Sequence, residues 1–125
     1  IKEGNDVTII SFGMGVHWAL ETLEKNNNIS ADLIDLRTLQ PLDYETIFNS
    51  VKKTGKVIIL QEDTLFGGIA SDLSATIMEE CFTYLDAPVK RIASLESPIP
   101  FMKNLEDQYL PKARFEKELL VLLKY

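Results

Sequence analysis

The chain has 125 residues, of which 46% are hydrophobic and 26% charged, a composition typical of one globular domain rather than a disordered segment. Its formal net charge of −6 argues against binding nucleic acid or anionic lipid through a basic surface, but it is compatible with a basic protein partner.

The lone cysteine, Cys81, cannot form an internal disulfide, which favours a reducing, cytoplasmic compartment. No apolar run approaches the roughly 18 residues that a membrane helix needs. Because the chain begins at Ile1 without a methionine, we expect residues 1–125 to be a single domain from a longer protein.

Short apolar runs alternate with amphipathic stretches along the chain. Helices are predicted where apolar residues recur at helical spacing, and these helices separate the predicted strands. The sheet should therefore be parallel with helices on both faces, and residues 1–3 are a candidate remnant of an earlier strand. The predicted strands cover residues 7–10, 33–36, 57–60 and 89–92, of which the last is more polar and is expected at an edge of the sheet.

Residues that favour helix ends stand at the expected places. The run Asn26-Asn27-Asn28 ends the first predicted helix. Asp43 is a candidate N-cap of the second helix, because its carboxylate can accept hydrogen bonds from free backbone amides. Gly55 is a candidate C-cap of the same helix, since glycine adopts the left-handed conformation that often ends helices.

A glycine pair and two prolines mark later connections. Gly67-Gly68 introduces the third helix, and it is also a candidate for close contact with a neighbouring subunit, because glycine permits backbones to approach. Pro98 and Pro100 predict a connection without regular structure between Ser94 and Leu110.

The segment Gly13-Met14-Gly15 follows an apolar strand and opens a helix, as in dinucleotide-binding domains, and Asp35 stands where such domains place a ribose-binding acid. The third glycine of that pattern is replaced by Trp18, which we expect to hold the helix away from a bound pyrophosphate. Asp35 also has a simpler explanation as the ion-pair partner of Arg37. The turn is therefore interpreted as architecture rather than as a nucleotide site.

Other reactive side chains do not combine into a site. Cys81 follows the apolar face of its helix, which indicates a core residue, and His17 is explained by local hydrogen bonding or packing. Glu62 and Asp63 are adjacent at the end of a strand, where successive side chains point apart. No nucleophile, base and oxyanion site are predicted together. The residues thus predict no catalytic, cofactor-binding or metal-binding side chain.

Three long stretches carry a family resemblance. They are "IDLRTLQPLDYETIFNSVKKTGKVIILQED" (34–63), "GGIASDLSATIMEECFTYLDAPVKRI" (67–92) and "SPIPFMKNLEDQYLP" (97–111). Together they resemble the C-terminal, transketolase-type domain of the beta subunit of 2-oxo acid dehydrogenases. That subunit belongs to the thiamine-dependent decarboxylating component of these multienzyme complexes.

The resemblance implies a three-layer α/β/α sandwich on a mixed, mostly parallel five-stranded sheet, whose first, antiparallel strand would lie at or just before Ile1. The parent enzyme would oxidatively decarboxylate a 2-oxo acid and transfer the acyl group to lipoamide. Its thiamine diphosphate and magnesium would be held by other domains. This domain would serve assembly with an alpha-type subunit or domain and a second beta-type subunit, and docking of the lipoyl acyltransferase.

The resemblance also implies two docking residues. In relatives with this arrangement, the acid of an L-D-A-P motif and the carboxylate at the chain end face basic residues of the acyltransferase's subunit-binding domain. Asp86 matches the first, and Tyr125 supplies the second if it is the natural end of the protein. Asp86 also has a structural explanation, as a turn residue before Pro88.

The substrate and the exact relative stay open in the sequence. The stretch "GGIASDLSATIMEECF" is similar to branched-chain 2-oxo acid enzymes, and "PFMKNLEDQYLP" is similar to pyruvate enzymes. Related alternatives are the C-terminal domains of transketolase and of deoxyxylulose phosphate synthase. A different alternative is a free-standing nucleotide-binding or regulatory α/β module built on the glycine turn.

Overall fold

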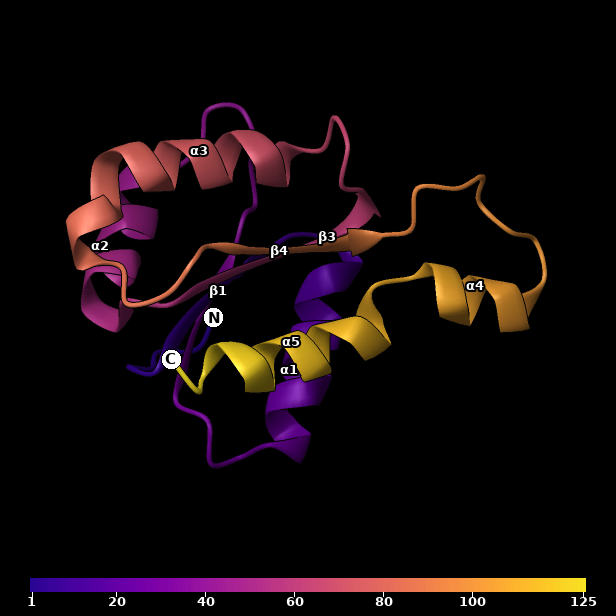
Figure 1. Ribbon diagram of the computed structural model, residues 1–125, viewed down its shortest axis with the longest axis horizontal. Helices are drawn as coiled ribbons and strands as arrows, with labels where there is room; N and C mark the ends of the chain where they lie inside the picture. Colours follow the sequence, from indigo (N-terminus) through magenta and orange to yellow (C-terminus); the bar gives the residue numbers. More distant parts are fainter.

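The computed structural model describes residues 1–125 and contains a parallel sheet between two layers of helices (Figure 1). None of the helices has both the length and the apolar character required to cross a membrane. The strands are β1 (Val7–Ser11), β2 (Ala31–Asp35), β3 (Val57–Thr64) and β4 (Lys90–Ser94). The helices are α1 (Met14–Lys25), α2 (Tyr44–Thr54), α3 (Ile69–Cys81), α4 (Lys103–Tyr109) and α5 (Lys112–Leu122), with a 3-10 turn, η1 (Phe82–Tyr84), after α3.

The strand order is β2-β1-β3-β4, and all three neighbouring pairs are parallel. Side chains alternate between the two faces of the sheet, so that Ile58 and Leu60 of β3 join one core while Val57 and Ile59 join the other. The first core lies beneath α1 and α5, and the second lies beneath α2 and α3. The α/β/α layering expected from the alternating pattern is confirmed (Figure 1).

Hydroxyl groups connect α2 to the sheet. The buried hydroxyl of Thr8 on β1 lies 2.7 Å from the hydroxyls of both Ser50 and Thr54 on α2. The Ser50 hydroxyl also donates to the carboxylate of Asp32 on β2 at 2.8 Å. No buried side-chain nitrogen or oxygen lacks a partner, so the polar groups of this core are satisfied.

The predicted helix ends are confirmed. The Asp43 carboxylate accepts a hydrogen bond from the Thr46 amide at 3.1 Å, which caps the start of α2. Gly55 ends α2 with a φ of 69°, in the left-handed region. Gly68 precedes α3, and a Cβ placed on it would clash with the Gln61 side chain and the Thr64 carbonyl oxygen. The close approach at Gly68 is therefore made within the chain.

The sheet has four strands, all parallel. The fifth, antiparallel strand, expected at or just before Ile1, is not formed here, where Lys2 makes only an isolated antiparallel bridge to Leu33 of the edge strand β2. One expectation is corrected. The connection from Ser94 to Leu110, predicted to lack regular structure, contains α4. Proline restricts only its own position and its close neighbours, and Lys103 lies beyond the reach of Pro100. The edge position predicted for β4 is confirmed.

Candidate functional site

The glycine turn after β1 brings α1 directly against the sheet. Gly13 has a φ of 56°, and α1 begins at the next residue. A Cβ placed on Gly15 would clash with the Ser11 hydroxyl and would stand 3.2 Å from the Leu60 carbonyl oxygen. Trp18, which was expected to hold the helix away from a bound pyrophosphate, is buried in the core beneath α1, and the first turn of α1 approaches the sheet through Gly15.

The acid that could have bound a ribose has another partner. Arg37 donates a hydrogen bond to the Asp35 carboxylate at 2.7 Å, which confirms the predicted ion pair. The two side chains border a cavity of about 480 Å³ beside the glycine turn, which Met14 and His17 also line. A ribose hydroxyl at this position would compete with a guanidinium for the same carboxylate.

The remaining candidates for chemistry are held apart. Cys81 is fully buried in the core beneath α2 and α3, whereas His17 is exposed on α1, on the opposite face of the sheet. Burial raises the pKa of the Cys81 thiol, so the nucleophilic thiolate is disfavoured. Glu62 and Asp63 both border one cavity at the end of β3, next to a register shift between β3 and β4.

The predicted docking residue Asp86 lies in the connection from η1 to β4. Its backbone amide donates to the Gly55 carbonyl oxygen at 2.8 Å, and its carboxylate lies against Gly55. The side chain is exposed, and no lysine or arginine pairs with it. Asp86 is thus a turn residue, in agreement with its structural explanation. It also presents an exposed carboxylate that can accept hydrogen bonds from a cationic side chain of a partner.

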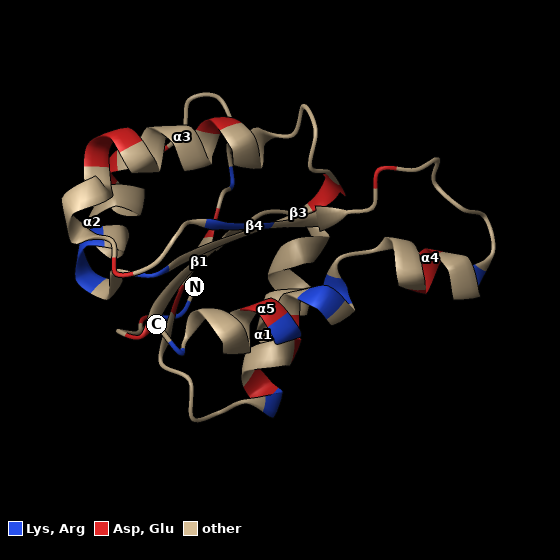
Figure 2. Ribbon diagram, viewed as in Figure 1, with Lys and Arg blue, Asp and Glu red and all other residues tan.

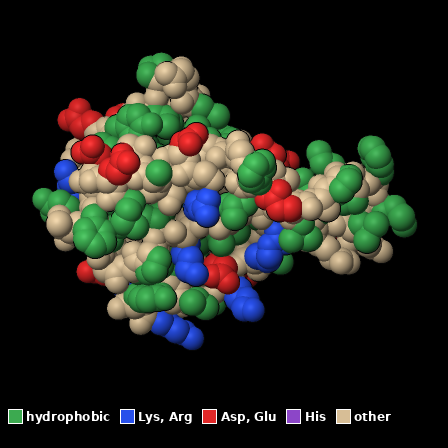
Figure 3. All heavy atoms as spheres, turned by 45° about the horizontal axis from the view of Figure 1, so that its top comes forward, with side chains coloured by type: hydrophobic (Ala, Val, Ile, Leu, Met, Phe, Trp, Pro, Cys, Tyr) green, Lys and Arg blue, Asp and Glu red, His purple; other side chains and the backbone are tan.

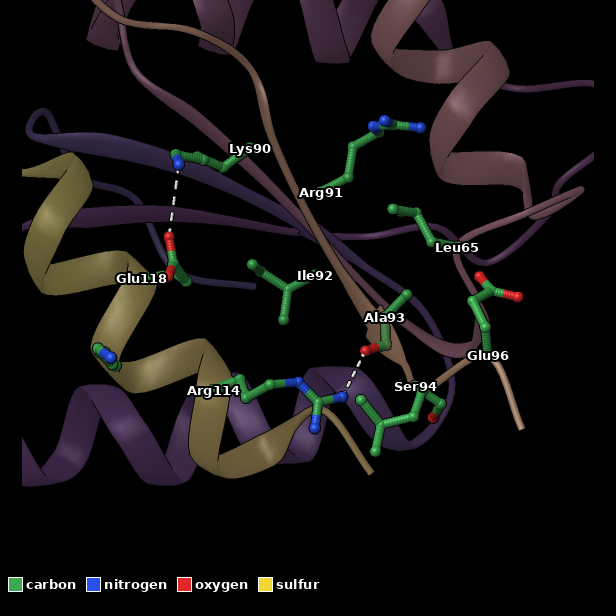
Figure 4. A pocket seen from close by; sticks show the side chains of 11 residues that line it. Leu65, Lys90, Arg91, Ile92, Ala93, Ser94, Glu96, Arg114 and Glu118 are labelled. Carbon is green, nitrogen blue, oxygen red and sulfur yellow. Dashed lines mark hydrogen bonds and ion pairs between the residues drawn. The ribbon is translucent and has the colours of Figure 1, made fainter. Parts of the chain in front are cut away.

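Helix α5 runs back along β4 from the carboxyl end of the strand toward its amino end. Figure 4 shows the first contact, where Arg114 donates to the Ala93 carbonyl oxygen at 2.7 Å. Farther along, the Lys90 ammonium and the Glu118 carboxylate are 3.4 Å apart, and both residues border a cavity of about 450 Å³. Arg114 carries no local sequence signal, because its acceptors are backbone carbonyls rather than a charged side chain.

This antiparallel course places both predicted docking residues at one end of the sheet. Leu122, near the end of α5, shares a core with Ala87, the neighbour of Asp86. Tyr125 follows directly and is 64% exposed. Figure 1 shows the C-terminus at the same end of the sheet as the connection from α3 to β4. Two positions 39 residues apart in sequence therefore both lie at the amino end of the parallel strands.

Most basic side chains of β4 and α5 are engaged within the chain. The Arg91 guanidinium donates to the Ser71 hydroxyl at 2.7 Å, and Lys90 pairs with Glu118. Figure 2 shows basic and acidic residues interspersed along α5. A surface of this kind differs from the clustered basic patch that phosphate backbones require.

Comparison with known proteins matches residues 1–114 to the family described as transketolase, C-terminal domain. The chain is 43% identical over 113 residues to the pyruvate dehydrogenase E1 component subunit beta of Rickettsia bellii (strain RML369-C), covering 89% of this chain and 35% of that protein. It is 43% identical over 112 residues to the 2-oxoisovalerate dehydrogenase subunit beta of Bacillus subtilis (strain 168), covering 87% of this chain and 34% of that protein.

A solved structure described as a split gene transketolase, inactive beta4 tetramer, matches with a TM-score of 0.80 and 28% identity, over 98% of this chain and 40% of that one. The chain spans about a third of the length of the two curated relatives named above. Their alignments run through the stretches that carry the sequence resemblance, and the resemblance is confirmed at the level of the domain. The chain belongs to the transketolase C-terminal domain family.

Proposed function

We propose that this chain is the C-terminal assembly and docking domain of the beta subunit of a thiamine-dependent 2-oxo acid dehydrogenase component. The proposal is supported by 43% identity to beta subunits of two such enzymes across most of the chain. The chain would be one domain, residues 1–125, of a longer protein. The parent would oxidatively decarboxylate a 2-oxo acid and transfer the acyl group to lipoamide in the cytoplasm, where Cys81 stays reduced.

The sequence identities do not distinguish between pyruvate and 2-oxoisovalerate as the substrate of the parent enzyme. The chain is 43% identical both to the pyruvate relative and to the 2-oxoisovalerate relative. Equal similarity is expected if the substrate is selected by residues in other domains of the parent. The transketolase alternative is supported at 28% identity by a solved structure, against 43% for the dehydrogenase subunits. The dehydrogenase assignment is therefore the one we propose.

The acidic residues of this chain do not form a site for the parent's magnesium ion. Magnesium prefers several oxygen ligands around one position. No three aspartate, glutamate, histidine or cysteine side chains are grouped closely enough to hold a metal ion. We therefore place thiamine diphosphate and magnesium in other domains of the parent, and we assign no catalytic step to this chain.

The assembly partners we propose are an alpha-type subunit or domain and a second beta-type subunit. Support for beta–beta association comes from the neighbour whose description names a beta4 tetramer and whose fold covers 98% of this chain. A domain without a reactive site can contribute to such an enzyme by holding its subunits together.

The docking partner we propose is the subunit-binding domain of the lipoyl acyltransferase. The observation that supports it is the unpaired, exposed carboxylate of Asp86 at the same end of the sheet as Tyr125. Carboxylates of this kind form charge-assisted, often bidentate hydrogen bonds with arginine. Two carboxylates from separate segments would fix both the position and the orientation of a basic partner.

The test is calorimetric titration of the chain with the subunit-binding domain of its cognate acyltransferase. Asp86→Asn keeps the shape of the side chain over Gly55 and removes its charge. We expect binding to weaken by at least about tenfold, since a hydrogen bond to a charged group contributes roughly 1.5–3 kcal/mol. Deletion of Tyr125, which moves the terminal carboxylate, should weaken binding as well.

Glu24→Gln is the matched control. Glu24 is exposed on α1 and its substitution changes the net charge by the same amount. It should leave the affinity unchanged, and added salt should reduce the difference between wild type and Asp86→Asn. Equal affinity of wild type and Asp86→Asn at low salt would remove the docking proposal.

A further inference from the structure

The chain between β4 and α5 projects from the sheet as an arm, residues 95–110 (Figure 1). Both ends of the arm are fastened. The Leu95 amide donates to the Tyr109 carbonyl oxygen at 3.1 Å. The Arg114 guanidinium donates to the same carbonyl at 3.2 Å and to the Ala93 carbonyl oxygen at 2.7 Å. Because its base is closed by these bonds, the arm holds a defined position relative to the sheet.

The arm exposes large apolar side chains. Phe101 is fully exposed, and Ile99, Met102 and Leu105 are each at least half exposed. Figure 3 shows hydrophobic side chains gathered on this projecting part of the molecule. Isolated apolar residues are common on protein surfaces, but several together on a held segment are typical of an interaction surface.

A cavity of about 350 Å³ lies between the arm and the sheet. Phe12 contributes from the end of β1, Glu62 and Asp63 from β3, and the arm supplies the other wall. In the sheet, β2 lies on one side of β1, whereas β3 and β4 lie on the other side of β1. The cavity therefore occupies the crevice at the carboxyl ends of the strands where the strand order reverses, which is where open α/β sheets bind ligands. Its wall residues from the arm are Ile99, Glu106, Tyr109 and Leu110.

The rim of the cavity is negatively charged and has no compensating cation. Glu62 and Glu106 are exposed, and neither carboxylate takes part in a hydrogen bond or salt bridge within the chain. The Asp63 carboxylate accepts only the neighbouring Thr64 amide, at 2.7 Å. No lysine or arginine lines the cavity. An apolar interior with a negative rim is complementary to an apolar side chain flanked by positive charge.

We propose that the arm and this cavity form a docking site for a segment of a partner protein that carries an apolar side chain between lysine or arginine residues. The apolar side chain enters the cavity, its basic neighbours pair with Glu62 and Glu106, and Phe101 and Met102 cover the segment. The site lies at the carboxyl ends of the strands, opposite Asp86, so it is independent of the docking function proposed above.

Charge also argues against two other occupants. A second copy docked symmetrically through this face would bring Glu62, Asp63 and Glu106 against their own equivalents. An anionic membrane would be repelled by the same carboxylates and by the net charge of −6. A basic protein segment avoids both penalties.

The experiment uses the whole chain and a short fluorescein-labelled peptide with one leucine between two pairs of lysines, measured by fluorescence anisotropy. Two separate variants test the two halves of the site: Phe101→Ser, and Glu62→Gln combined with Glu106→Gln. Each should weaken binding of the peptide by about tenfold, because Phe101→Ser removes the apolar cover of the segment and the double variant removes the partners of its lysines. A peptide with glutamates in place of the lysines should not bind.

Matched controls lie at other places on the surface. Phe82 is 67% exposed beyond the end of α3, and Glu79 and Glu80 are exposed on α3 itself. Phe82→Ser, and Glu79→Gln combined with Glu80→Gln, should leave the affinity unchanged. All these side chains are exposed, so the fold is retained in every variant.

Four results would overturn the proposal. The peptide could fail to bind at all, or it could bind the site variants and the controls equally. Sedimentation could reveal a dimer that Phe101→Ser abolishes, which would assign the arm to a second copy of the chain. Cosedimentation with phosphatidylcholine and phosphatidylserine vesicles, lost in Phe101→Ser, would assign it to a lipid surface.

Discussion

The carboxylate of Asp86 lies directly over Gly55, and the backbone amide of Asp86 donates a hydrogen bond to the Gly55 carbonyl oxygen at 2.8 Å. The end of α2 and the turn before β4 are joined at this point. A side chain larger than hydrogen at position 55 would displace the carboxylate that we propose for docking. The glycine therefore serves both the end of the helix and the placement of Asp86.

We expect Gly55→Ala to destabilise the chain by more than Gly67→Ala. Both glycines have a positive φ, of 69° and 71°, and leaving glycine there costs about 1–2 kcal/mol. A Cβ at Gly55 also clashes with Asp86, whereas a Cβ at Gly67 has no heavy atom within 4 Å. Urea unfolding gives both free energies. Combining Gly55→Ala with Asp86→Ala should recover the part of the lost stability that comes from the clash with the Asp86 side chain. An equal loss of stability in Gly55→Ala and Gly67→Ala would contradict the contact between Gly55 and Asp86.

Asp43→Ala should lower the urea midpoint of unfolding at neutral pH. The hydroxyl of Thr46, followed by its backbone amide, lowers the pKa of Asp43 below the ordinary value of 3.8. A carboxyl group whose pKa is lowered by folding stabilises the fold above that value, and the contribution is lost as the pH falls through the folded pKa. The difference between wild type and Asp43→Ala should therefore shrink in acid.

Asp43→Ser is the control for this cap, because a serine hydroxyl also accepts from the helix amides but does not titrate. It should retain part of the stability at neutral pH. A difference between wild type and Asp43→Ala that stays constant down to the most acidic pH would show that the carboxylate charge does not matter.

Phe115→Ala should destabilise the chain by about 3–5 kcal/mol, the range for removing a large aromatic side chain from a packed core. Phe115 is completely buried beneath α5. Phe101→Ala should change the free energy of unfolding by less than about 0.5 kcal/mol, since the side chain is fully exposed. Chemical denaturation of both variants measures the contrast, and a large loss from Phe101→Ala would mean that the arm packs within the chain.

Cys81 should react with a thiol reagent only when the chain unfolds. Burial raises the pKa of its thiol above the ordinary value of 9.0, so neither access nor ionisation favours reaction. The corresponding stabilisation is fully present below pH 9.0 and is lost as the pH rises above it, because the unfolded thiol then ionises first. Reaction rates with a disulfide reagent across a urea titration provide the measurement. Fast reaction of the native chain in buffer would contradict the burial.

Features that depend on neighbouring residues could be predicted from the sequence. The four strands, the helices between them and the cap at Asp43 each follow from a pattern spanning a few residues. The edge position of β4 also followed, because charged side chains on a strand are tolerated where one side is open. The pairing of Asp35 with Arg37 needed only a separation of two residues.

Features that depend on distant partners could not be predicted in the same way. Helix α4 was missed because only Tyr109 among its residues is buried, so it has no apolar stripe to recognise. The core position of Trp18 and the close approach of Gly15 to the sheet also depend on distant partners, because only the packed structure shows which residue faces which neighbour.

The sequence by itself determined the order of strands and helices, their ends and the family resemblance, because these are written in local periodicity and in contiguous motifs. Only the tertiary structure decided that Asp86 meets Gly55, that Tyr125 returns to the same end of the sheet, and that the arm closes a cavity over Phe12. The physical reason is that each of these relationships joins segments far apart in the chain. Their proximity is fixed by the packing of α5 along β4 and by the order of the strands.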